Sequence, residues 1–79
     1  FYSGTDAAIQ LLQYKDTAEY YLVVIYMGTP PALSDSNGSV FQLLQAGDGY
    51  TTDSIFAAYV PQYGANYAVT INGETVYIS

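Results

Sequence analysis

The sequence contains no cysteine, no histidine and no tryptophan, and Lys15 is its single basic residue. Without cysteine no disulfide can cross-link the chain, and without cysteine and histidine the usual zinc ligands are missing. The commonest general base and the best nucleophile of enzymes are missing for the same reason. We therefore predict no catalytic residues, no metal site and no cofactor, and we do not expect an enzyme.

The chain also lacks the positive charge that two classes of partner require. Seven acidic residues against one basic residue give a net charge of −6. Nucleic-acid binding depends on lysine and arginine side chains that neutralise phosphates, and docking on anionic lipid depends on basic clusters. The longest apolar run, residues 20–27, is shorter than the roughly 20 residues of a membrane-spanning helix. We expect no nucleic-acid partner and no membrane insertion by this chain.

Charged residues of either sign are scarce, at 10% of the chain. An average domain has about 25%. The solvated surface must therefore come from serine, threonine, glutamine, asparagine and the ten tyrosines. This composition favours an extracellular or cell-surface location.

The length of 79 residues predicts one small domain, residues 1–79. A chain of this size buries only roughly 60% of the surface that it exposes when unfolded, so its stability is small. Disulfides and zinc, which stabilise many small domains, are excluded here. We therefore expect further stabilisation by association, with other copies of the chain or with a sister subunit.

The clearest structural signal is a β-hairpin over residues 67–79. Tyr67, Val69 and Ile71 alternate with smaller residues, and a second alternating run follows at residues 74–78. Asn72-Gly73 lies between the two runs, and this dipeptide suits a type I′ turn, in which both central residues have positive φ.

Three further strands are predicted upstream of the hairpin. Residues 19–27 are dense in valine, isoleucine and tyrosine, and we expect a central strand buried on both faces. Residues 40–45 and 55–60 also have strand character, whereas residues 34–39 read as a polar loop. Turn signals that recur about every ten residues are typical of a small antiparallel β-sandwich or barrel, here of about five strands.

Residues 7–15 allow two interpretations. Ala8, Leu11, Leu12 and Lys15 form a helical stripe, and alanine, glutamine and leucine favour helices, so we predict a short helix. The alternative is a strand with Ile9 and Leu11 on one face. The fold class is therefore mainly β, or α+β if the segment is helical.

Acidic residues near turns were considered as cation ligands. Asp48 and Asp53 flank a turn and could share a hard cation with backbone carbonyl groups. Ordinary turn chemistry, in which an aspartate bonds its own backbone, is the interpretation that we favour. Asn37-Gly38-Ser39 is an N-glycosylation sequon in a predicted surface loop, so Asn37 is a glycosylation candidate.

Tyrosine is the main functional signal, because it combines a large apolar face with a polar tip suited to interfaces and to sugar rings. We expect the tyrosines around Pro61 to be exposed. The apolar start of the chain is a second docking candidate, which could add to the sheet edge of another subunit. The predicted interface residues are Phe1, Tyr2, Leu11, Tyr59, Tyr63 and Tyr67.

These observations favour a secreted or cell-surface structural subunit that associates with itself, as in an extracellular filament, pilus or coat. The high content of β-branched residues and tyrosine, and the lack of charged residues that block sheet-to-sheet pairing, support this interpretation. The alternative is a non-catalytic binding module whose surface tyrosines hold a glycan or inhibit a partner protein.

Overall fold

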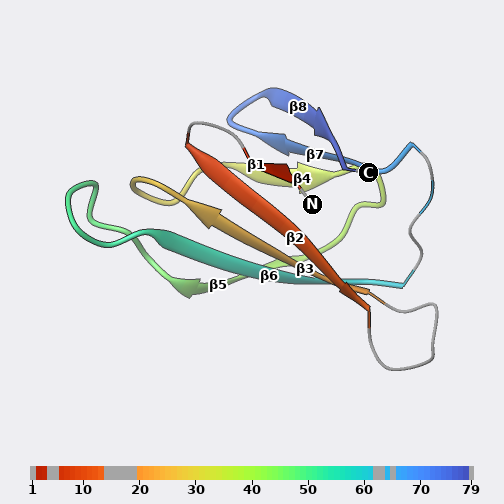
Figure 1. Ribbon diagram of the computed structural model, residues 1–79, viewed down its shortest axis with the longest axis horizontal. Helices are drawn as coiled ribbons and strands as arrows, with labels where there is room; N and C mark the ends of the chain where they lie inside the picture. The colour runs from red at the N-terminus through yellow and green to blue at the C-terminus, as the bar shows by residue number, and fades with distance from the viewer. Residues whose placement is uncertain (1, 4–5, 14–19, 62–63, 65, 79) are drawn as a thin grey trace.

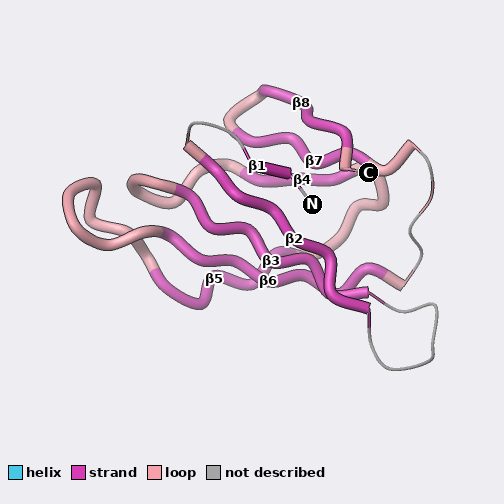
Figure 2. Tube along the Cα trace, in the orientation of Figure 1, coloured by secondary structure: helices cyan, strands magenta, loops and turns pink. Residues whose placement is uncertain are grey.

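The computed structural model describes residues 2–3, 6–13, 20–61, 64 and 66–78. Every regular element in this part of the chain is a β-strand, and Figure 2 shows strands and loops only. The strands are β1 (Tyr2–Ser3), β2 (Ala7–Gln13), β3 (Tyr20–Tyr26), β4 (Leu33–Asp35), β5 (Phe41–Gln45), β6 (Ser54–Val60), β7 (Ala68–Ile71) and β8 (Glu74–Tyr77).

The strands form two antiparallel sheets that pack on each other. The larger sheet has the order β1-β2-β3-β6-β5, and the smaller sheet has the order β4-β7-β8. Figure 1 shows the smaller sheet lying over one side of the larger sheet. Neither sheet closes on itself, so the predicted small β-sandwich is confirmed and the barrel is not formed. The structure adds β1, β2 and β4 to the strands expected from the sequence.

The core lies between the two sheets. Ile9, Leu22, Val24 and Val60 of the larger sheet and Val69 of the smaller sheet are completely buried. Leu22 and Val24 lie two positions apart on β3, and Ile9 pairs with Val24, so the three side chains point to the same face of the larger sheet. This face is apolar, and the smaller sheet covers it. Because β3 pairs along its whole length with both β2 and β6, it is the centre of this sheet.

The prediction of a helix over residues 7–15 is wrong. Residues Ala7–Gln13 form a strand, paired with β3 from Ala7↔Tyr26 to Gln13↔Tyr20. Helix propensity is a weak preference, and the pairing with β3 together with the burial of Ile9 outweighs it. The alternative with Ile9 and Leu11 on one face is the correct one, and residues 14–15 lie outside the described part of the chain.

The expectation that the strand over residues 19–27 is buried on both faces is also wrong. Leu22 and Val24 are fully buried, whereas Tyr21 and Ile25 on the opposite face are 42% and 41% exposed. The smaller sheet covers only one side of β3. Among the described residues no element covers the other side, although its residues are as apolar as those of a doubly covered strand.

The C-terminal hairpin is confirmed. Strands β7 and β8 pair across Asn72 and Gly73, which have φ values of 50° and 85°. The turn also joins the two sheets, since Asn72 exchanges hydrogen bonds with Ala32 before β4 and its side-chain amide donates to the Tyr26 hydroxyl of β3 at 3.3 Å. The Asn72-Gly73 turn, whose conformation is set by the local sequence, therefore fixes a contact between the hairpin and segments that are distant in the sequence.

We predict that Gly73→Val destabilises the protein by about 1–3 kcal/mol, because a β-branched residue is strained at positive φ. A Cβ at position 73 would meet nothing within 4 Å, so the loss would come from the backbone alone. Gly64→Val is the matched control, because Gly64 also has open space but lies outside the positive-φ region. Equal melting temperatures for the two variants would contradict the strained turn.

Candidate functional site

The outward side of the larger sheet is apolar. Side chains that point away from the core alternate with buried ones along β2, β3 and β6, and strand pairing aligns them in rows. One row runs across Leu12, Tyr21 and Tyr59, with the two tyrosine rings 5.4 Å apart between centroids. We call the whole surface the outer face; its residues are Ala8, Gln10, Leu12, Tyr21, Val23, Ile25, Ile55, Ala57 and Tyr59, and the Gln10 amide is a polar group among mostly apolar side chains.

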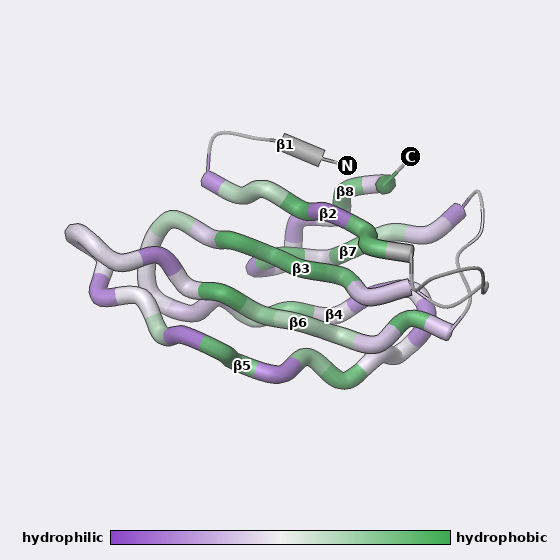
Figure 3. Tube along the Cα trace, turned by 60° about the horizontal axis from the view of Figure 1, so that its bottom comes forward, coloured by the Kyte–Doolittle hydropathy of each residue, from purple (hydrophilic) through white to green (hydrophobic). Residues whose placement is uncertain are grey.

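The outer face carries no charge. Strands β2, β3, β5 and β6 contain no acidic or basic residue. Four side chains of the face are 41–45% exposed, those of Leu12, Tyr21, Ile25 and Tyr59. Figure 3 looks onto this sheet, with β4 and β7 behind it, and shows hydrophobic residues concentrated along β3 and β6. The described acidic residues lie elsewhere: Asp6, Asp35, Asp48, Asp53 and Glu74 occupy loops or the smaller sheet.

The outward side of the smaller sheet has a different character. Thr70 and Thr75 lie opposite each other there, and their hydroxyl groups are 3.0 Å apart. Ser34 pairs with Thr70 on the same side. Small hydroxyl side chains are typical of a solvated sheet surface, so the two outward surfaces of the sandwich differ in the kind of neighbour that they favour.

Strand β5 forms an uncharged edge of the larger sheet. Leu43 and Leu44 are 47% and 57% exposed, although Gln42 and Gln45 add polar groups. The pairing with β6 shifts register between Leu43 and Gln45, which marks a bulge. Bulges interrupt the ladder that an added strand would need. The outer face, rather than the β5 edge, is therefore the larger regular surface that stays uncovered among the described residues.

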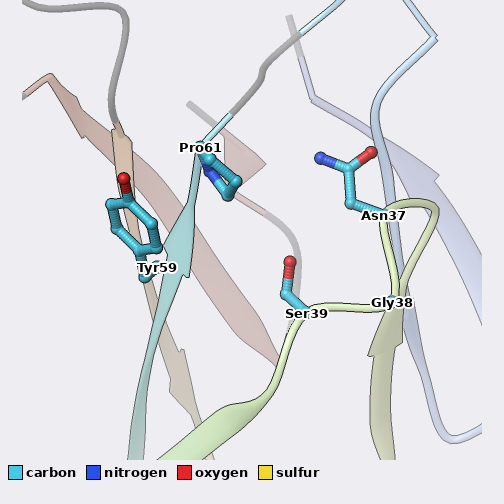
Figure 4. Close-up of a pocket in the computed structure, with 5 residues that line it drawn as sticks. All are labelled: Asn37, Gly38, Ser39, Tyr59 and Pro61. Carbon is cyan, nitrogen blue, oxygen red and sulfur yellow. The ribbon is translucent and has the colours of Figure 1, made fainter.

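A second feature is a pocket where β6 ends against the loop before β5. Its volume is about 430 Å³, and we call it the Tyr59 pocket. Figure 4 shows the Tyr59 ring and Pro61 on the β6 side and the Asn37 side chain extending toward them from the loop. The described residues that line it are Asn37, Gly38, Ser39, Tyr59 and Pro61. All five are uncharged.

Asp35 organises the loop that carries Asn37 and Ser39. Its Oδ1 accepts hydrogen bonds from the Asn37 and Ser39 backbone N–H groups at 3.1 and 2.7 Å. Its Oδ2 accepts a hydrogen bond from the Tyr67 hydroxyl at 2.7 Å. One carboxylate thus joins the loop wall of the Tyr59 pocket to the base of the C-terminal hairpin.

These contacts shift the acidity of both partners. Burial of Asp35 alone would raise its pKa, but hydrogen bonds from Ser39, Tyr67 and Asn37 outweigh it and hold the pKa below the ordinary 3.8. Burial, and then the hydrogen bond and charge of Asp35, raise the pKa of Tyr67 far above the ordinary 10.0. Asp35 is therefore ionised and Tyr67 neutral near pH 7, as the hydrogen bond requires.

The turn at Asp48 uses its carboxylate internally. Asp48 Oδ1 accepts hydrogen bonds from three backbone N–H groups that follow it, those of Tyr50, Thr51 and Thr52. These bonds hold the pKa of Asp48 well below its ordinary value. This is the turn chemistry that the sequence favours over a cation. In the described part of the chain no three acidic residues gather as metal ligands.

The structure places the predicted interface residues in different environments. Tyr59 is 44% exposed and belongs to both the outer face and the Tyr59 pocket. The expectation that Tyr67 is exposed is wrong, because this residue is 3% exposed and anchors Asp35. Leu11 packs against the core, because its side chain points toward the smaller sheet.

The docking of the chain start on another subunit stays a prediction. Tyr2 pairs with Ile9 within the same chain, so β1 forms one edge of the larger sheet. Phe1 and Tyr63 lie outside the described residues. Asn37 is exposed in its loop, as a glycosylation acceptor must be, and its glycosylation stays a prediction.

Sequence reasoning missed Leu12, Tyr21 and Ile25 as surface residues. The helix assigned to residues 7–15 removed Leu12 from the sheet, and the continuous apolar run hid the alternation of residues 20–26. The absence of charge from residues 7–13 and 20–26 was the available signal, because a solvated sheet face normally carries charged residues.

Comparison with known proteins gives no assignment. No protein-family model matches the chain, and neither the curated proteins nor the solved structures contain a significant match. Among the described residues, no helix is long and apolar enough to cross a membrane. The function must therefore be argued from the outer face and the Tyr59 pocket.

We predict that Tyr67→Phe destabilises the protein by about 1.5–3 kcal/mol at neutral pH, the usual contribution of a hydrogen bond to a charged group. Because the folded-state pKa of Asp35 is lowered, this stabilisation is present above the ordinary pKa of 3.8 and is lost as the pH falls through the folded-state value. The difference between variant and native protein should therefore shrink in acid.

The control for this prediction is Tyr77→Phe, which removes a hydroxyl from a side chain that is 69% exposed. Urea unfolding of the two variants from neutral to acidic pH is the measurement. A Tyr67→Phe protein as stable as the control at neutral pH would show that the Asp35 contact contributes little.

Proposed function

We propose that this protein is a structural subunit of an extracellular or cell-surface assembly, and that it associates with other copies of itself through the outer face. The observation that carries the proposal is the uncharged apolar surface made by β2, β3 and β6 on a chain with a net charge of −6. Association would bury apolar side chains that are half-exposed in the single chain, those of Leu12, Tyr21 and Ile25, and this burial is favourable.

A second copy is the occupant that charge and shape favour. A basic partner would meet the described acidic residues, which lie in loops and on the smaller sheet, and would have no counterpart among the described residues of the outer face. A copy of the same sheet offers an equally neutral surface with the same twist, as aligned sheet packing requires. Such a contact is two-fold and uses one patch on both subunits.

The size of the face sets the expected strength. Strands about 4.8 Å apart and seven residues of about 3.4 Å give the three long strands a breadth of roughly 15 Å and a length of roughly 24 Å. This footprint is smaller than the ~800 Å² that each partner buries in a standard interface. The contact through this face is therefore expected to be weak and concentration-dependent, and growth into a filament would need a second contact.

The first test places a charge on the outer face, on its central strand β3. We expect the native protein to associate as its concentration rises, and Ile25→Lys to remain monomeric, because a buried lysine without a partner is costly. Tyr77→Lys adds the same charge on the smaller sheet and should associate like the native protein. Sedimentation equilibrium over a dilution series measures the masses, and circular dichroism verifies that each variant is folded.

Two outcomes would contradict the proposal. One is a native protein that stays monomeric at the highest soluble concentration. The other is an Ile25→Lys protein that associates as strongly as the Tyr77→Lys control, since association would then use a different surface.

The second test uses salt. Copies with a net charge of −6 repel each other, and added salt screens this repulsion over a Debye length of about 10 Å at 0.1 M. An apolar contact between like-charged subunits should therefore strengthen as sodium chloride is added, as measured by light scattering at constant protein concentration. Weaker association at higher salt would indicate a contact held by ion pairs and would exclude the outer face.

A further inference from the structure

The Tyr59 pocket has the size and composition of a small-ligand site. Its volume of about 430 Å³ lies within the range of roughly 300–1,000 Å³ found for such sites. The Tyr59 ring and the Pro61 ring supply apolar surface on one side. The Asn37 amide and the Ser39 hydroxyl supply hydrogen-bond donors and acceptors on the other side, as Figure 4 shows.

The loop wall is held in place before any ligand arrives. Asp35 accepts hydrogen bonds from the Asn37 and Ser39 backbone N–H groups, and the Gly38 N–H donates to the Asp35 carbonyl group at 3.3 Å. The buried Tyr67 hydroxyl fixes the Asp35 carboxylate in turn. A ligand that binds here does not have to order the loop, so less affinity is lost to conformational entropy.

Charge selects among ligand classes. None of the described lining residues is basic, and the Asp35 carboxylate holds the loop, so phosphates, sulfates and acidic sugars are disfavoured. None of the described lining residues carries a carboxylate either, so they do not attract a cation. The remaining class combines a flat apolar surface with a rim of neutral hydroxyl groups, which is the chemistry of a neutral pyranose.

We propose that the Tyr59 pocket binds one neutral pyranose ring of the β-glucose type. Equatorial hydroxyl groups leave the faces of such a ring apolar, so that one face packs on Tyr59 as sugar rings pack on aromatic side chains. The hydroxyl groups at the rim exchange hydrogen bonds with the Asn37 amide and the Ser39 hydroxyl. This site is separate from self-association except at Tyr59, which belongs to both surfaces.

The test is a titration of the unglycosylated protein with methyl β-glucopyranoside, followed by amide chemical shifts in NMR. The Ile25→Lys protein is used beside the native protein, so that changes in association do not move the signals. We expect saturable shifts at Asn37, Gly38, Ser39 and Tyr59. Methyl β-glucuronide, which has the same ring with a carboxylate, should bind more weakly because of the acidic chain.

Variants separate the two walls of the pocket. Asn37→Ala should weaken binding about tenfold, the effect of losing one good hydrogen bond. Tyr59→Leu keeps an apolar side chain on the outer face but removes the flat ring, and should weaken binding at least as much. Gln42→Ala removes an exposed amide from β5, outside the pocket, and should leave the affinity unchanged.

Three results would overturn the proposal. The first is the absence of saturable shifts up to the solubility of the sugar. The second is a set of shifts that saturates but lies away from the pocket. The third is equal affinity in Asn37→Ala, Tyr59→Leu and Gln42→Ala. Because Ile25→Lys removes association without touching the pocket, failure here is distinguishable from failure of the proposed assembly.

Discussion

The structure depends on the packing of the smaller sheet on one face of the larger sheet, because this contact forms the core; within the described residues, nothing covers the opposite face. Strand β3 is apolar on both sides, and burial of Leu22 and Val24 under the smaller sheet forms the core. Tyr21 and Ile25 point the other way and stay half-exposed. The described strands form two layers, and neither layer lies on that side. The uncovered outer face is thus a direct consequence of where the core was built.

The distribution of charge follows the same division. Strands β2, β3, β5 and β6 contain no acidic residue, whereas Asp35, Asp48 and Glu74 lie in loops or on the smaller sheet. Solubility therefore depends on one side of the sandwich and on its loops, which leaves the outer face free to meet another neutral surface. The bulge in β5 limits direct strand addition at the edge, so face-to-face packing is the contact that the geometry favours.

Polar contacts between segments that are distant in the sequence position the loop wall of the Tyr59 pocket. The Tyr67 hydroxyl and the Asp35 carboxylate connect the hairpin to the loop that carries Asn37, and the Asn72 side chain connects the hairpin to β3 through Tyr26. The hairpin therefore determines where one wall of the Tyr59 pocket stands, although the hairpin does not line it. A protein without disulfides fixes its loops through buried hydrogen bonds of this kind, which are stronger where a partner is charged.

The sequence by itself determined the elements whose signals are local. Asn72-Gly73 specified the hairpin because few residues tolerate positive φ, and the β-branched run specified β3 as a strand. The scarcity of charge was also readable before any fold was known. Only the tertiary structure decided that residues 7–13 extend, because their pairing with β3 outweighs helix propensity. It alone decided that Tyr67 is buried while Tyr59 is exposed, since burial depends on which face of each strand meets the other sheet.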